Sequence, residues 1–93
     1  MTPKNNTSLY EYSVWFRDQN SIPSDQDFEW VVCFIVEAES KEKAQLWGDE
    51  LSKSYAIKNP NNFFLNSSVA LANQSNLPIV GFGTKPSDKY IGW

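Results

Sequence analysis

The chain has 93 residues, eleven acidic and eight basic side chains, and a formal net charge of −3. This length is typical of one domain, residues 1–93, in which we expect residues 1–7 to form a flexible tail. The basic side chains are scattered, which argues against nucleic-acid binding because phosphate contacts need clustered Lys and Arg. No apolar run is long enough to cross a membrane and no secretory signal is visible. A single cysteine cannot form an internal disulfide, so we expect a cytoplasmic protein.

The first predicted strand covers residues 8–17, SLYEYSVWFR. Its alternate positions separate an aromatic face from a mixed face, which is the pattern of a strand with one buried side. The aromatic face consists of Tyr10, Tyr12, Val14 and Phe16. A polar connection, residues 18–27, leads to the next predicted strand, and we expect the two strands to pair antiparallel.

Residues 28–38, FEWVVCFIVEA, are the longest apolar stretch and are predicted to form a central strand. Both faces are apolar, which is typical of a strand covered on both sides. Trp30, Val32, Phe34 and Val36 lie on one face, and Val31, Cys33 and Ile35 lie on the other. Because the stretch is long for a small domain, we expect a bulge, a bend or a frayed start near its beginning.

Residues 38–55 change to the helical period. Ser40 is suited to be the N-cap, because its hydroxyl can accept a hydrogen bond from an early helix N–H. The apolar side of this helix consists of Ala44, Trp47, Gly48, Leu51 and Tyr55. We interpret Gly48 as the point where helix and sheet approach most closely. The exposed side offers two acid-first pairs at i,i+4 spacing, Glu39–Lys43 and Asp49–Lys53.

The last third of the chain is harder to assign. Pro60 and its Asn neighbours end the helix. Residues 63–72, FFLNSSVALA, fit a strand better than a helix. As a strand they place Phe63, Leu65, Ser67, Val69 and Leu71 on one face. Residues 79–85 form a short strand weakened by two glycines, which we expect at an edge. A turn and an aromatic tail follow.

The predicted class is therefore α+β, with a four-stranded antiparallel sheet and one amphipathic helix on one face, in the order β-β-α-β-β. Part of this order resembles the ferredoxin-like split β-α-β arrangement, at the level of fold pattern alone.

No residue pattern points to catalysis. Without histidine, Ser–His and Cys–His nucleophile pairs are excluded, as are histidine-containing metal sites. Asp25, Asp27 and Glu29 cluster before the central strand, and we interpret them as a solvated loop rather than an acid–base pair or a calcium site. Cys33 lies among apolar neighbours and is predicted to be structural. We expect no enzyme activity, no cofactor and no metal.

One face of the predicted sheet has no partner within the chain. The single helix can cover one side, and the other side would remain apolar over an area larger than monomers usually expose. The residues that we expect at this interface are Trp15, Val31, Cys33, Ile35, Phe64 and Trp93. Three covers are possible: a second copy of the chain, a different protein, or the C-terminal tail with Tyr90, Ile91 and Trp93.

The resulting expectation is a small interaction module that forms a homodimer or binds another protein. Its size, acidic charge and aromatic content also fit an inhibitor or immunity-type protein that binds a heterologous partner. A further alternative, from a different class, is a small-ligand-binding domain whose pocket is lined by Trp15, Trp47 or Trp93.

Overall fold

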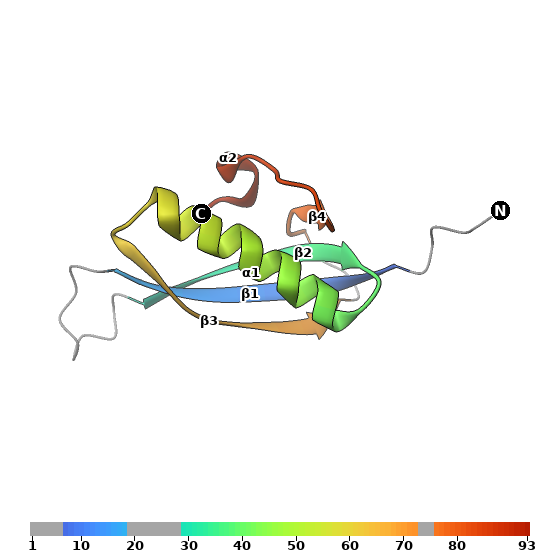
Figure 1. Ribbon diagram of the computed structural model, residues 1–93. Coiled ribbons are helices and arrows are strands. Elements are labelled where there is room, and N and C mark those ends of the chain that lie inside the picture. Colours follow the sequence, from blue (N-terminus) through green and yellow to red (C-terminus); the bar gives the residue numbers. More distant parts are fainter. Residues whose placement is uncertain (1–6, 19–28, 73–75) are drawn as a thin grey trace.

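The fold was analysed in a computed structural model that describes residues 7–18, 29–72 and 76–93. It is an α+β domain in which one long helix lies across one face of a four-stranded sheet (Figure 1). The elements in chain order are β1 (Ser8–Asp18), β2 (Glu29–Ala38), α1 (Lys41–Lys58), β3 (Asn62–Leu71), β4 (Ile79–Gly81) and α2 (Asp88–Ile91). Residues 19–27 of the predicted polar connection, with Asp25 and Asp27, lie outside the described residues, as does Phe28, whereas Asp18 is the last residue of β1.

The sheet has the order β3-β1-β2-β4 and is mixed, so the prediction of a fully antiparallel sheet is wrong. β1 pairs antiparallel with both β2 and β3, whereas β4 pairs parallel with β2. The reason is the connection after β3: the chain crosses from one edge of the sheet to the other and enters β4 in the direction of β2. The ferredoxin-like arrangement is therefore matched only in part.

The core lies between the sheet and α1, as the alternation in the two hairpin strands predicts. Tyr12, Val14, Phe16, Phe34 and Val36 are completely buried. They pair across β1 and β2, Tyr12 opposite Phe34 and Val14 opposite Val32, because directly opposite residues share one face of a sheet. This register runs without a shift from Ser8 to Arg17, so the described part of the central strand contains no bulge. The predicted start of the strand at Phe28 lies outside the described residues.

The helix begins where the sequence predicts. The Ser40 hydroxyl accepts a hydrogen bond of 3.1 Å from the Lys43 N–H, which satisfies one of the free donors of the first turn. Ala44, Gly48 and Leu51 are buried against the sheet. A Cβ atom at Gly48 would collide with the ring of Tyr12, which supports the interpretation of this glycine as the closest approach of helix and sheet.

One of the two predicted helix ion pairs is present. The Lys43 ammonium lies 2.7 Å from the Glu39 carboxylate, and this hydrogen bond lowers the pKa of Glu39. The second prediction is wrong, because the carboxylate of Asp49 turns inward and the Lys53 ammonium lies 5.4 Å from the centre of the Phe64 ring. The buried donors that face Asp49 account for this difference.

Residues 62–71 form a strand, in agreement with the preferred of the two predictions. Its register against β1 shifts between Trp15 and Phe16, so that one extra residue of β3, Leu65, stands at a bulge. This shift moves Phe64 to the helix side of the sheet, opposite Phe16, and places Phe63 on the other side. The prediction that Phe63 shares a face with Val69 is therefore wrong, because the bulge lies between them.

The C-terminal residues return to the helix side. β4 has three residues instead of the predicted seven and ends in a turn closed by the Thr84 N–H and the Gly81 carbonyl, 2.9 Å apart. After α2, Trp93 stacks on Tyr55 with ring centres 4.6 Å apart and contacts Phe16 and Phe34. The tail thus completes the core beside α1.

Candidate functional site

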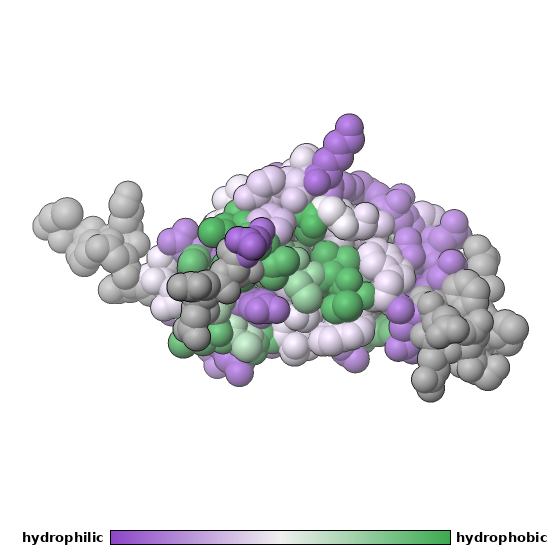
Figure 2. Space-filling view, turned by 180° about the vertical axis from the view of Figure 1, so that it is seen from behind, coloured by the Kyte–Doolittle hydropathy of each residue, from purple (hydrophilic) through white to green (hydrophobic). Residues whose placement is uncertain are grey.

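The candidate site is the side of the sheet that faces away from α1, which we call the reverse face. Its members follow from the strand register: Trp15 opposite Val31, Ser13 opposite Cys33, Arg17 opposite Phe63 and Ile35 beside Ile79. The view from behind shows hydrophobic side chains gathered near the middle of this side, with hydrophilic ones around them (Figure 2). This combination of an apolar centre and a polar rim is typical of protein interfaces.

Exposure separates the two ends of the reverse face. Val31 and Phe63 are each 49% exposed, and Trp15 is half-buried. In contrast, Ile35 is only 1% exposed, although it lies on the same side of β2 as Val31. The Ile35 N–H donates to the Pro78 carbonyl at 2.8 Å, so the segment that enters β4 lies against this end of the strand. The open part of the reverse face therefore centres on Trp15, Val31 and Phe63.

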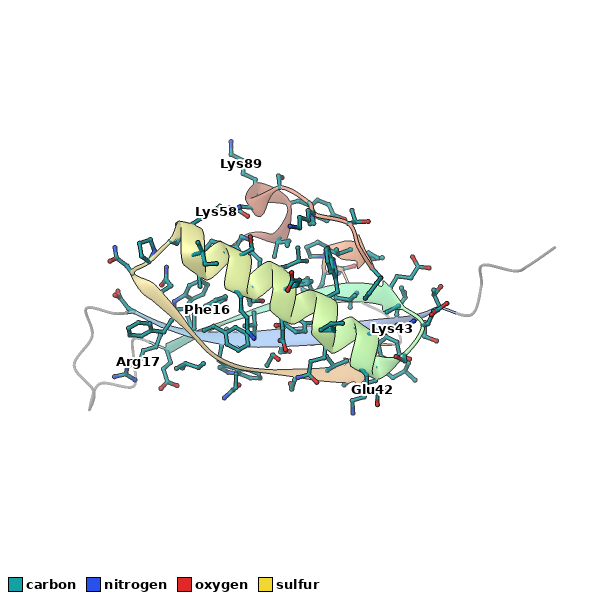
Figure 3. All side chains as sticks on the ribbon, viewed as in Figure 1. Phe16, Arg17, Glu42, Lys43, Lys58 and Lys89 are labelled. Atoms are coloured by element: carbon teal, nitrogen blue, oxygen red, sulfur yellow. The ribbon has the colours of Figure 1, made fainter. Side chains whose placement is uncertain are left out.

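Charged side chains lie at the ends of the strands. Arg17 and Glu29 form an ion pair of 3.1 Å at one end, where Figure 3 shows Arg17 projecting beside the sheet. Glu11 and Glu37 lie toward the other end, and the Glu37 carboxylate accepts a hydrogen bond from the Thr7 hydroxyl at 2.9 Å. The middle of the reverse face carries no charge.

The structure divides the six predicted interface residues. Trp15, Val31, Cys33 and Ile35 belong to the reverse face, with Ile35 already covered. Phe64 and Trp93 lie on the helix side, in contact with Phe16. Their predicted placement is wrong because the bulge reverses Phe64 and because Trp93 fills the gap between Tyr55 and the sheet. The interface role of the other residues stays a prediction.

Two exposed residues of this surface were not predicted. The bulge decides that Phe63 lies on the reverse face. The sequence does not predict the bulge, because two consecutive phenylalanines place one aromatic ring on each side of the sheet in either register. Ile79 is 47% exposed beside Ile35 and would have needed the parallel pairing of β4. No local pattern in the sequence encodes either feature.

Cys33 lies on the reverse face and is half-buried. Its sulfur lies 3.4 Å from the Ser13 hydroxyl on the neighbouring strand. This contact orients the thiol across the β1–β2 pair and adds no basic group that would activate it as a nucleophile.

A second cluster of polar groups, partly buried, lies between α1 and the sheet. The Tyr12 hydroxyl donates to Asp49 at 2.7 Å and lies 3.1 Å from the Ser52 hydroxyl. The Ser67 hydroxyl donates to the same Asp49 oxygen at 2.6 Å, and the Gln45 amide donates to the Ser67 hydroxyl and carbonyl. Burial, and further the Asp49 charge, raise the pKa of Tyr12, so its phenol stays neutral. We interpret this cluster as a polar connection that fixes the helix on β1 and β3.

The three tryptophans that the sequence offers as lining residues for a ligand pocket lie apart. Trp15 belongs to the reverse face, and Trp93 lies in the core. Trp47 packs against Phe82 and donates its indole N–H to the Thr84 carbonyl at 2.9 Å. They therefore do not form the wall of one shared site.

No protein-family model matches the chain, and no match was found among the curated proteins or the solved structures. Within residues 7–18, 29–72 and 76–93, no helix is long and apolar enough to cross a membrane. The same residues contain no group of three Cys, Asp or Glu side chains placed to hold a metal ion.

Proposed function

We propose that this protein is a non-catalytic interaction module that associates with a second copy of itself through the reverse face. The observation that carries the proposal is the contrast across the sheet: Val31 and Phe63 are half exposed, whereas Phe16 and Phe34 on the other side are completely buried. Uncharged apolar side chains at the centre of an open sheet face favour burial against another surface.

The size of the reverse face supports a weak association. Three strands of ten or eleven residues, at roughly 3.3 Å per residue and ~4.8 Å between strands, give about 490 Å² per copy. A symmetric pair would bury about 980 Å² by this estimate, which is below the range of stable complexes. The association should therefore depend strongly on protein concentration.

A second copy fits this surface without bringing like charges together. Sheets that stack with their strands in opposite directions keep the Glu11–Glu37 ends of the two copies apart. Each such end then lies toward the Arg17–Glu29 ion pair of the other copy. Twofold pairs of this kind are the commonest assemblies of identical chains.

The test is the variant Phe63→Lys, with Leu46→Lys as its control. Both positions are exposed, but Leu46 lies on α1, away from the reverse face. We expect sedimentation equilibrium to give a mass that rises toward two chains for wild type and for Leu46→Lys, and the mass of one chain for Phe63→Lys. Equal association of both folded variants would contradict the proposal.

A wild-type protein that stays monomeric at every concentration would also overturn self-association. An inhibitor or immunity-type protein with a heterologous partner would then be the next candidate. The ligand-binding alternative, with a pocket lined by Trp15, Trp47 or Trp93, stays a prediction.

A further inference from the structure

The sheet has an unpaired edge along the first half of β2. β4 pairs with only three residues of this strand, Ile35 to Glu37, and Figure 1 shows it beside the arrowhead end of β2 alone. From Glu29 to Phe34, no strand in the described part of the chain lies on this side. The strand that the sequence predicts to be central is thus an edge strand for more than half of its length.

The hydrogen bonds to the β4 segment fix the direction of the main-chain groups in β2. The Ile35 N–H donates to Pro78 and the Glu37 carbonyl accepts from the Phe82 N–H, so both residues point their main-chain groups toward this edge. Because the direction alternates along a strand, Glu29, Val31 and Cys33 point theirs the same way. The continuous register with β1 leaves no bulge that would change this alternation.

The opposite edge of the sheet is protected, and the β2 edge is not. On β3, the same alternation, starting from the Ala72 N–H that donates to Leu9, points Ser67 outward. The Gln45 side chain covers the Ser67 carbonyl at 3.2 Å, and the bulge interrupts the strand before it. Bulges and covering groups are the common devices that prevent pairing at an edge. Within the described part of the chain, the stretch Trp30–Phe34 has no bulge and no strand beside it, and it carries no charged side chain.

We propose that this edge pairs with the same edge of a second copy. In an antiparallel pair centred on Val31, Val31 of each copy stands opposite Val31 of the other, and Glu29 stands opposite Cys33. Each of these positions has outward main-chain groups, so every pair would exchange two hydrogen bonds. The pairing would also bury the half-exposed Val31 side chains against each other on the reverse face.

Charge and geometry agree with this register. The two Glu29 carboxylates would be separated by four residues along the strands, about 13 Å at roughly 3.3 Å per residue. That separation exceeds the Debye length of about 8 Å at physiological ionic strength. The register ends before Ile35, where β4 begins, so the added strand and β4 would lie end to end beside β2.

The variant Val31→Pro tests the edge without touching the internal sheet. Its missing N–H points away from β1 in the wild type, so the β1–β2 hydrogen bonds are kept, whereas pairing at the edge loses its central donor. Val31→Thr is the matched control, because it keeps both the N–H and the β-branched shape. We expect the association constant of Val31→Pro, from sedimentation equilibrium, to be at least tenfold lower than that of Val31→Thr.

Amide hydrogen exchange of the wild type provides a second measurement that needs no variant. We expect the Val31 and Cys33 amides to exchange slowly at high protein concentration and faster on dilution. Exchange rates that do not change with concentration, or equal association of folded Val31→Pro and Val31→Thr, would overturn the edge pairing.

The edge proposal does not rest on the proposed stacking of reverse faces, and the two fail in different experiments. Phe63 lies on β3, two strands away from this edge. If Phe63→Lys abolishes association and Val31→Pro does not, stacking is supported and edge pairing is wrong. The reverse result supports edge pairing alone.

Discussion

The two faces of the sheet differ in the burial of their apolar side chains, although they belong to the same strands. On the helix side, aromatic rings from β1, β2, α1 and the C-terminal residues pack together, and a closed group of hydrogen bonds joins Tyr12 to Asp49. On the reverse face, apolar side chains stand half exposed, and no strand among the described residues pairs with the outer edge of the first half of β2. Hydrophobic residues of one strand therefore form the core on one face and an exposed apolar surface on the other, and only their burial distinguishes the two groups.

The largest difference should appear between two substitutions on β2. We expect Phe34→Ala to lower the free energy of unfolding by about 4 kcal/mol, because it removes a completely buried ring. Val31→Ala, on the other face, should cost about 0.5 kcal/mol in dilute protein, since the side chain is half exposed. Urea unfolding followed by tryptophan fluorescence measures both. Similar costs would show that the two faces are not as different as their exposure indicates.

The helix side can be tested for tightness at Gly48. Gly48→Ala should destabilise the fold by about 2 kcal/mol, because the new methyl group meets the Tyr12 ring, which is buried and held by hydrogen bonds. Glu50→Ala, at an exposed position of α1, should instead be neutral within about 0.5 kcal/mol. A Gly48→Ala variant that melts above wild type would refute close packing here.

The buried phenol gives the helix side a dependence on alkaline pH. The pKa of Tyr12 is raised above its ordinary 10.0 in the folded state. The contribution of the neutral phenol to the free energy of unfolding is therefore complete below pH 10 and is lost as the pH rises further. Tyr12→Phe should cost about 1.5 kcal/mol at neutral pH. Above pH 10 the stability difference between wild type and variant should shrink by up to about 1.4 kcal/mol per pH unit. A difference that does not change between pH 8 and pH 11 in urea unfolding would exclude this role for the phenol.

The sequence predicts the parts of the fold that depend on local pattern. The alternation around Tyr12 and Phe34, the N-cap at Ser40 and the close approach at Gly48 all follow from residue type and spacing. The side of β3 on which Phe64 lies does not, because one extra residue at a bulge reverses the alternation. The parallel pairing of β4 depends on where the chain crosses the sheet, which is a long-range choice.

The candidate site was predictable to a similar extent. The sequence predicts that Trp15, Val31 and Cys33 lie on the side opposite the aromatic face, and the strand register places them there, whereas their role in an interface stays a prediction. Phe63 and Ile79 are not among the residues that the sequence predicts, and Ile35, which it predicts to be open, is 1% exposed. These three depend on pairings between distant segments. The open edge of β2 depends on the shortness of β4, where the glycines give only a weak signal.

The central position of β1 has a consequence for the order of folding. Tyr12 meets Phe34 within a hairpin, but it meets Val69 only after the chain has passed through α1. The hairpin closes the shorter loop and should form earlier on the path from the unfolded state. In kinetic measurements, substitutions at the β1–β2 seam should therefore slow folding, whereas substitutions on β3 should mainly accelerate unfolding. Until β3 arrives, the growing sheet has β1 itself as an open edge, and that interval is when the chain is most exposed to aggregation.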